Sequence, residues 1–315
     1  PVVVTGLTVN TAYTFTVAAA NPTGNSAYSA ASNSATPTSP DRGFFTAGIG
    51  TLNYKTTEYI NIATTGNGTN FGNTATHHVS AGAVGSSTRI LTIAGWDATT
   101  GLNTGTVEYL TIASSGSGTS FGSVTPTYLN DPGSCSSSTR GVIGGGHIGS
   151  NTGVIEYFTI ASTGNATNFG NTTGTTYEET GISSPTRGIF AGSGNASIDY
   201  ITIASTGNAA DFGDLTVTTR GSFACSNSTR GLIGGGQGPG ADLQNNIDYI
   251  TIASTGSVQD FGDMTAAIGF IKGCSSSVRG VFGGGETSPA QINVIQYVTI
   301  SSTGNAQDFG DLTVI

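Results

Sequence analysis

The sequence predicts an all-β protein built as a six-bladed β-propeller, and three observations support this prediction. A stretch of nineteen residues recurs almost unchanged, as at 198–216, 247–265 and 295–313. The copies follow one another every 43 to 50 residues, which is the length of one propeller blade. No segment has helical periodicity of useful length, whereas short runs of β-branched and aromatic residues alternate with polar ones. One copy cannot bury its faces alone, so neighbouring copies must pack together.

Three residue types anchor each copy at fixed places: an arginine, a tyrosine and a phenylalanine. The arginines are Arg42, Arg89, Arg140, Arg187, Arg230 and Arg279, the tyrosines are Tyr59, Tyr109, Tyr157, Tyr200, Tyr249 and Tyr297, and the phenylalanines are Phe71, Phe121, Phe169, Phe212, Phe261 and Phe309. The tyrosine-to-phenylalanine interval is always 12, whereas the arginine-to-tyrosine interval varies from 13 to 20. Length changes therefore fall in one connection of each blade. We expect these six loops to share one rim with the blade-to-blade connections and to form the binding face.

Each copy is expected to contain four strands. In the fifth copy the first strand is 221–225, and a Ser/Asn turn leads to the second, 230–236, which ends in a run of glycines. The third strand is the Ile-Asp-Tyr-Ile-Thr-Ile-Ala stretch at 247–253, which alternates with period two. A Ser-Thr-Gly turn then leads to the fourth strand around the Phe-Gly pair.

The domain organisation predicted from the sequence is a partial domain at 1–37, a linker at 38–41 and the propeller of six repeats of about 48 residues at 42–315. Six second, third and fourth strands are visible but only five first strands, because Arg42 follows the preceding domain almost at once. We expect the missing strand to come from beyond Ile315. A seventh blade is the alternative. The chain begins at Pro1 without a methionine, so we interpret it as an excerpt of something longer.

Composition excludes several classes of function. The net charge of −9 with only 9 Lys and Arg argues against a nucleic-acid partner, which needs clustered cations. No apolar run reaches the ~18 residues of a membrane span, so membrane insertion is not expected. Such an acidic chain suits an extracellular or virion surface.

Two resemblances add to this reading. The Gly-Gly ending of the second strand, followed by Tyr and a later aromatic, resembles kelch-type propellers, although that aromatic is Phe rather than Trp. Residues 1–37 resemble the last strands of a fibronectin type III β-sandwich, with Leu7 six residues before Tyr13 and then Phe15 and Val17. Together with the repeat at 41–315, the combination looks like repeat proteins of marine tailed bacteriophages, notably cyanophages. That resemblance implies a virion structural or tail-fibre protein.

The repeated arginines have potential partners in the residue that precedes each tyrosine. This residue is acidic in five copies: Glu58, Glu108, Glu156, Asp199 and Asp248, with Gln296 in the sixth. One cation and one anion per blade predict structural ion pairs that tie strands or blades together. The alternative is a ring of arginines that binds an anion in the central channel.

No cofactor or metal site is predicted. The carboxylates around Phe-Gly-Asp, such as Asp211 and Asp214, are replaced by Asn or Ser in the first three copies, which favours turn chemistry over calcium or catalysis. Cys135, Cys225 and Cys274 occupy a slot that Val or Ile fills elsewhere, so they are expected to be buried free thiols. The adjacent His77 and His78 should point to opposite faces and make a poor metal pair.

The variable loops hold the candidate ligand contacts. Trp96 lies in the longest of them, 95–105, where an aromatic beside Asp97 and Asn103 is suited to stacking on a sugar, or alternatively packs the loop onto its neighbour. The other candidates in these loops are His147, Asn151, Gln237 and Glu286.

The function predicted is a non-enzymatic virion structural or adhesion protein, in a tail or fibre. Its expected partners are host-surface glycan or neighbouring virion subunits, in a homo-oligomeric assembly with many weak contacts. A bacterial cell-surface adhesin is the second hypothesis. A carbohydrate-active propeller enzyme is the third, disfavoured because nearly every carboxylate follows the repeat.

Overall fold

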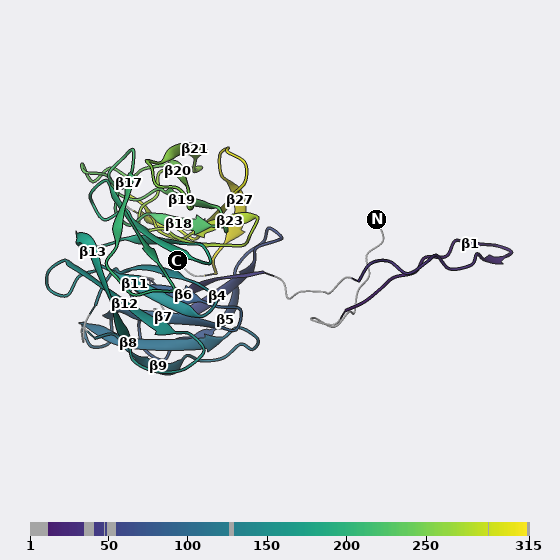
Figure 1. Cartoon of the computed structure of the whole chain (residues 1–315), viewed down its shortest axis with the longest axis horizontal. Helices are drawn as coiled ribbons and strands as arrows, with labels where there is room; N and C mark the ends of the chain where they lie inside the picture. The colour runs from purple at the N-terminus through teal and green to yellow at the C-terminus, as the bar shows by residue number, and fades with distance from the viewer. Residues whose placement is uncertain are drawn as a thin grey trace. The chain divides into compact units, whose positions relative to one another are not determined.

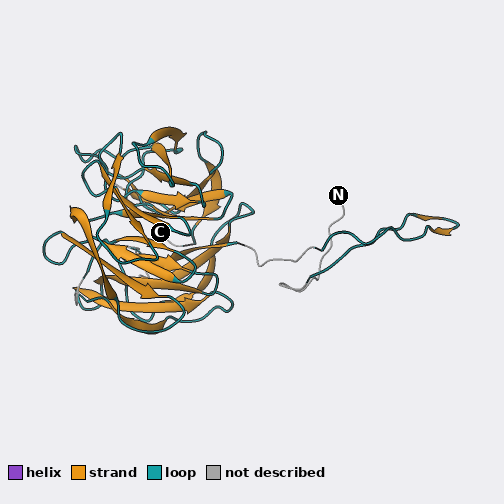
Figure 2. Cartoon of the chain, in the orientation of Figure 1, coloured by secondary structure: helices purple, strands orange, loops and turns teal. Residues whose placement is uncertain are grey.

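A computed structural model describes residues 12–34, 41–46, 48, 55–125, 129–288 and 290–313. The chain divides into two compact units, Pro1–Asp41 and Arg42–Ile315. Figure 2 shows strands and loops in the described part of both units and no helix. The all-β class predicted from the sequence is confirmed.

The described part of the first unit is a hairpin whose tip carries two short strands, β1 (Ala20–Asn21) and β2 (Gly24–Asn25). Below the tip, the amides of Ser26, Ser29 and Ser32 bond to carbonyls of the facing arm at 2.8 Å. The serine hydroxyls also accept hydrogen bonds from amides of that arm, at 2.9–3.0 Å. Leu7, on which the fibronectin-like resemblance depends, lies outside the described residues.

The second unit is a six-bladed β-propeller (Figure 1). Blade 1 has three strands in the described residues, and each of the other five has four, in consecutive antiparallel order. The strands of blades 1 to 3 are β3 (Arg42–Thr46), β4 (Thr56–Asn61), β5 (Thr69–Asn73); β6 (Gly82–Gly85), β7 (Arg89–Asp97), β8 (Leu102–Thr111), β9 (Thr119–Ser123); and β10 (Gly133–Ser136), β11 (Arg140–Gly144), β12 (Thr152–Thr159), β13 (Thr167–Thr176). Those of blades 4 to 6 are β14 (Thr180–Ser183), β15 (Arg187–Ala191), β16 (Ser197–Thr202), β17 (Ala210–Asp214); β18 (Phe223–Ser226), β19 (Arg230–Gly234), β20 (Asn246–Thr251), β21 (Gln259–Asp263); and β22 (Lys272–Ser275), β23 (Arg279–Gly283), β26 (Val294–Thr299), β27 (Gln307–Asp311). The remaining hairpin, β24 (Glu286–Thr287) and β25 (Ala290–Gln291), belongs to a loop of blade 6.

The first strand of each four-stranded blade is the innermost, because β6, β10, β14, β18 and β22 contact one another in sequence. The ring closes between blade 6 and blade 1. The amides of Gly66 and Gly68 donate to the carbonyls of Phe309 and Asp311, at 2.8 and 2.7 Å. The same pair of bonds joins the turn of every other blade to the outer strand of the blade before it. A sixfold arrangement therefore accounts for all six copies.

The fixed Arg, Tyr and Phe form one repeated stack. In every blade the Tyr and Phe rings meet edge to face, with centroids 5.9–6.2 Å apart. The guanidinium of the same blade lies 4.2–4.7 Å above the tyrosine ring. It also donates to a main-chain carbonyl of the next blade at 2.7–3.3 Å, as from Arg187 to Ile252. Each arginine therefore holds two blades together through an aromatic ring and a carbonyl.

This arrangement corrects the predicted ion pairs. The acid and the tyrosine are consecutive in a strand, so their side chains lie on opposite faces of the sheet. The arginine shares the tyrosine's face, as Arg187 does above Tyr200, and Asp199 points to the other side. Among the described residues no repeated arginine pairs with a carboxylate.

The acids instead bond to the preceding blade, at the end of its outer strand or just after it. Asp199 accepts from the amide and the hydroxyl of Thr173, both at 2.7 Å. Threonines at the matching place of the other blades donate equivalent bonds to Glu58, Glu108, Glu156, Asp248 and Gln296. That Gln296 makes the same bond explains why an amide can replace the carboxylate. The two charged positions of one blade therefore secure two different interfaces.

The glycine after each repeated phenylalanine lies where the next blade comes closest. Gly213 has a φ of 148°, and a Cβ there would lie 2.5 Å from the Gly256 carbonyl oxygen. A side chain at this place would push the two blades apart.

All three cysteines are free. Cys135 and Cys225 are buried, as expected, whereas Cys274 is half-buried. Burial raises the pKa of the Cys274 thiol to about 12. Each sulfur lies close to a glycine of the next blade, as Cys135 Sγ does to Gly188.

Candidate functional site: the variable rim

Within the described residues, the variable loops of blades 2, 3, 5 and 6 meet the blade-to-blade connections at one rim, as predicted. The contact is made by the residue seven places after the repeated arginine. The main chain of this residue pairs with the main chain of the connection that enters the same blade. These isolated pairs are Val79–Trp96, Asn130–His147, Arg220–Gln237 and Gly269–Glu286. The same place holds Trp, His, Gln or Glu in a framework that otherwise repeats closely. The rim is therefore where the chain varies side chains most freely.

The connections themselves form a second layer of the rim. Ser80, Asp131, Glu178 and Phe270 have left-handed φ values of 51–56°, and Gly221 occupies the same place with φ 63°. The Asp131 amide bonds to the Ser80 carbonyl at 2.8 Å, and the Gly221 amide to the Glu178 carbonyl at 3.1 Å. Left-handed backbone is unfavourable for residues other than glycine, so its recurrence shows that the surrounding ring imposes this turn.

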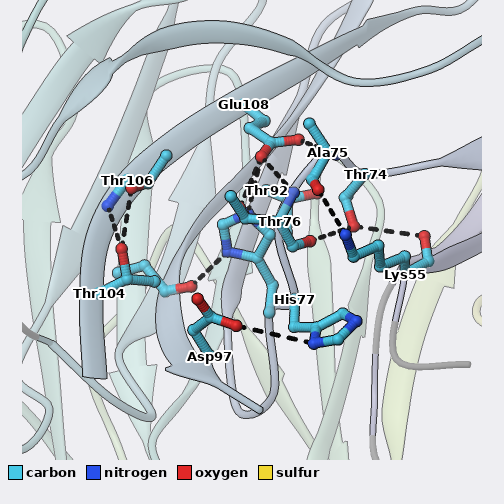
Figure 3. Close-up of polar contacts among 12 residues, drawn as sticks. Lys55, Thr74, Ala75, Thr76, His77, Thr92, Asp97, Thr104, Thr106 and Glu108 are labelled. Atoms are coloured by element: carbon cyan, nitrogen blue, oxygen red, sulfur yellow. Dashed lines mark hydrogen bonds and ion pairs between the residues drawn. The ribbon is translucent and has the colours of Figure 1, made fainter. Parts of the chain in front are cut away.

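In blade 2 the rim is formed by a hairpin that extends β7 and β8. Trp96 pairs with Asn103 in this hairpin and is half-buried, whereas Leu102 near its tip is 68% exposed. Asp97 accepts from the Thr99 amide at 2.8 Å and lies 3.6 Å from His77 Nδ1 (Figure 3). Burial acts to raise the pKa of Asp97, but the bonds from Thr99 and Thr100 and the nearby His77 lower it overall. The contacts of Asp97 thus hold the hairpin close to its turn.

The other predicted contacts sit on separate blades of the same rim. His147 and Asn151 face each other across the blade 3 loop, with Nδ1 3.2 Å from Oδ1. Glu286 is half-buried in β24. Gln237 accepts a hydrogen bond from Arg220 Nε at 3.1 Å. The structure therefore places all seven candidates on one rim but does not gather them into one pocket.

A charged network on the rim was missed from the sequence. Arg220 donates to the Tyr177 hydroxyl at 2.9 Å, lies above that ring, and has its Nη1 3.5 Å from Glu178 Oε2. Burial raises the pKa of Glu178, and Arg220 opposes that shift. The sequence contained one indication of this network: Arg220 and Lys272 are two of the only three Lys and Arg residues that are not repeated arginines.

Lys272 is the second cation of this network. It begins β22, the innermost strand of blade 6, and it is exposed to solvent. Crowding by the surrounding protein atoms lowers its pKa, and Asp131 and Glu178 act in the opposite direction. Burial likewise raises the pKa of Asp131, and Lys272 and His147 oppose this. Two carboxyl groups and two cations of different blades therefore share the rim.

Glu179 follows Glu178 in the chain and is only 4% exposed. Burial raises its pKa to about 8; the Thr176 hydroxyl opposes this shift, and the nearby Asp199 carboxylate adds to it. A carboxyl with this pKa is mostly protonated at neutral pH. The stability of the fold therefore falls as the pH rises, because the buried group resists ionisation.

His77 and His78 contact different partners, but they lie in the connection between β5 and β6 and not on a strand, so the predicted strand alternation does not apply to them. His78 is completely buried, with Nδ1 2.6 Å from the Ala94 carbonyl and Nε2 2.8 Å from Thr76 Oγ1. The Thr76 hydroxyl donates to Glu108 at 2.6 Å (Figure 3). His78 Nε2 lies 3.5 Å from Glu108 Oε1, so the three side chains form one buried hydrogen-bonded cluster. Although burial acts to raise it, the pKa of Glu108 is lowered to about 2 by His78, Thr76 and Ala75.

The repeated carboxylates lie elsewhere. Asp211 and Asp214 belong to the outer strand β17 rather than to a turn, and both are exposed. Within the described ranges no group of three or more His, Cys, Asp or Glu is arranged to hold a metal ion.

No protein-family model matches the chain, and no curated protein matches it. In the portion of the chain that the structure covers, no helix is long and apolar enough to cross a membrane.

Proposed function

We propose that the propeller is a non-enzymatic recognition module that binds a surface through its variable rim. The observation that carries this proposal is the contrast between the two parts of each blade. The Arg–Tyr–Phe stack recurs six times without change, whereas the rim position after the glycines holds Trp96, His147, Gln237 or Glu286. A purely structural ring has no need of such variation at one edge.

The chemistry of the rim favours a polar ligand. Trp96 and Tyr177 supply aromatic surface, while Arg220, Glu178, Lys272 and neighbouring amides supply donors and acceptors. Aromatic rings beside hydroxyl-binding groups suit a glycan. The likeness of the repeats to cyanophage proteins supports a place in a virion tail or fibre, in several copies, with host-surface glycan or a neighbouring virion subunit as partner.

The test is binding of the 315-residue chain to a glycan array and to host cells. Variants Trp96→Ala and Arg220→Gln should lose binding while their circular dichroism and melting stay close to wild type. The variant Asp211→Asn, at an exposed place in the outer strand β17, is the matched control and should bind normally. Unchanged binding by both rim variants would contradict the proposal. Detection of the chain as a stoichiometric component of purified particles would favour the virion over a bacterial surface.

A carbohydrate-active enzyme is the second candidate, because the rim brings together carboxyl groups that do not follow the repeat. Asp131 and Glu178 lie on different blades and both have raised pKa values, which suits acid–base chemistry. Release of reducing sugar from a polysaccharide panel, abolished by Asp131→Asn and by Glu178→Gln, would favour this candidate over simple binding.

A further inference from the structure

The turn between the third and fourth strands forms a small polar pocket on two blades. The pocket of blade 5 has a volume of about 130 Å³, and its polar wall is made by Tyr249, Thr251, Ser254, Thr255, Ser257 and Gln259. The pocket of blade 2 has a volume of about 200 Å³, and residues at the same six places line it: Tyr109, Thr111, Ser114, Ser115, Ser117 and Thr119. Because the two linings match place by place, the pocket belongs to the repeated framework and not to one irregular loop. The shorter side chain of Thr119 in place of Gln259 fits the larger volume in blade 2.

Both pockets lie at the end of the blades opposite to the variable rim. The strands of a blade are antiparallel and in consecutive order, so the turn after the third strand lies at the same end as the turn after the first strand. The rim loops and the blade-to-blade connections lie at the other end. Blades 2 and 5 are three places apart in a ring of six, so the two pockets lie on opposite sides of the ring.

The residue after the turn glycine distinguishes these two blades from the other four. It is Ser117 in blade 2 and Ser257 in blade 5, whereas the other blades have an asparagine there: Asn67, Asn165, Asn208 and Asn305. Each asparagine accepts a hydrogen bond through Oδ1 from a main-chain amide of the preceding blade, at 3.0–3.1 Å. Within the described part of the chain, the hydroxyls of Ser117 and Ser257 have no such partner. They can therefore bond to a ligand in the pocket.

The tyrosine wall of the pocket is held in one orientation. In blade 2 the Arg89 guanidinium lies 4.4 Å above the Tyr109 ring, and the Phe121 ring meets its edge with centroids 6.1 Å apart. In blade 5 the Tyr249 hydroxyl donates to Gln259, whereas Thr119 takes that place opposite Tyr109. A wall that is already fixed loses little conformational entropy when a ligand binds, which favours affinity in a small site.

The lining of both pockets suits a neutral ligand that is rich in hydroxyl groups. None of the lining residues is charged, and most carry a hydroxyl, which can both donate and accept hydrogen bonds. Both volumes are below the ~300–1,000 Å³ of pockets for drug-sized ligands, so each pocket has room for one ring-sized unit. A tyrosine adds an apolar ring face with a polar tip, as a sugar ring requires.

We propose that the turn pockets of blades 2 and 5 each bind one neutral hexopyranose unit, with the hydroxyls of Ser117 and Ser257 as ligand contacts. One chain then carries two sugar sites on opposite sides of the ring. These sites share no residue with the variable rim, so they stand whether or not the rim binds a glycan.

The test is a titration of the isotope-labelled 315-residue chain with three neutral probes, followed by amide chemical shifts. The probes are methyl α-D-glucopyranoside, methyl α-D-mannopyranoside and methyl β-D-galactopyranoside, and the open-chain polyol sorbitol is the control. At least one glycoside should shift the amides of Gly116 and Gly256 in a saturable manner. Sorbitol should bind roughly tenfold more weakly or less, because it lacks the rigid ring.

Two opposite substitutions test the role of the serine. The double variant Ser117→Asn with Ser257→Asn installs the residue of the other four blades, so it should fold with unchanged or higher melting temperature. It should bind the glycoside roughly tenfold more weakly or less, because the free hydroxyls are lost and the new side chains bond to the preceding blades. Asn165→Ser should create a third site, seen as a new saturable shift of the Gly164 amide.

The rim variant Trp96→Ala is the control that separates the two surfaces, and it should bind the glycoside as the wild type does. Absence of a saturable shift at Gly116 and Gly256 with all three glycosides would overturn the proposal. Equal binding by the double asparagine variant would also overturn it, and equal binding of sorbitol would exclude a sugar-ring site.

Discussion

Replacing Glu179 by glutamine should stabilise the propeller at neutral and alkaline pH. The carboxyl is 4% exposed and its pKa is about 8 in the fold, against an ordinary value of 4.5. Between these two values the unfolded chain releases a proton that the folded chain keeps. Stability is therefore unaffected below pH 4.5, falls as pH rises towards 8, and then levels off.

The size of the effect follows from the distance between the two pKa values. A pH of 7 is about 2.5 units above the ordinary pKa of the carboxyl group, and each unit corresponds to ~1.36 kcal/mol. The buried carboxyl group therefore lowers the free energy of unfolding at pH 7 by about 3 kcal/mol. Glutamine has nearly the same shape and does not ionise, so Glu179→Gln should recover up to that amount. Part is offset because the buried amide needs its own hydrogen bonds.

The assay is urea unfolding of the wild type and the variant from pH 5 to pH 9. The two stabilities should be similar near pH 5 and should diverge progressively up to pH 8. Asp211→Asn, at an exposed position in β17, is the control and should follow the wild type throughout. Parallel curves for Glu179→Gln and wild type would refute the burial argument.

Three further predictions concern the contacts between blades. Arg187→Met should lower the free energy of unfolding by about 2 kcal/mol, because it removes the hydrogen bond to Ile252 and the cation above the Tyr200 ring. The same loss is expected in an Asp199→Asn background. If the loss disappears there, Arg187 and Asp199 form an ion pair and the contacts described above are wrong. Gly188→Ala should destabilise by roughly 1–3 kcal/mol through its clash with Cys135 Sγ, with partial rescue by Cys135→Ala in calorimetry, and no rescue would refute the contact. Glu108→Gln should cost about 3 kcal/mol at pH 7 because the buried carboxylate accepts hydrogen bonds from the amides of Ala75 and Thr76 and from the Thr76 hydroxyl. Since the Glu108 pKa is lowered, the wild-type advantage should persist above pH 4.5 and vanish as pH falls towards 2, and an advantage independent of pH would contradict these bonds.

Most of what could be predicted about the fold came from the sequence repeat. A constant interval of 12 between Tyr200 and Phe212, and between their equivalents, predicts that each pair is held in one geometry, and all six meet edge to face. The same strand alternation should have placed Asp199 away from Arg187, yet their recurrence in register suggested a pair. Periodic spacing identifies the blade, whereas the face of each side chain decides its partner.

The rim network was harder to predict because its members come from different blades. Asp131, Glu178 and Lys272 are far apart in the sequence, and only closure of the ring brings them near each other. Their raised or lowered pKa values depend on burial beneath the rim, which composition does not reveal. Ile90, by contrast, could be recognised in the sequence, because every other repeated arginine is followed by glycine. The reason for those glycines became clear only from the structure, where each faces a side chain of an inner strand.

Ring closure is tested most directly by a thiol cross-link between blade 1 and blade 6. The Asp311 amide donates to Asn67 Oδ1 at 3.1 Å, so cysteines at both positions should react with one short bifunctional reagent within a single chain. Mass spectrometry of the monomer should then recover the two linked peptides, whereas Asn67→Cys paired with Asp214→Cys should give none. If the first pair links only between molecules, or not at all, the six copies do not form a ring and the shared rim does not exist.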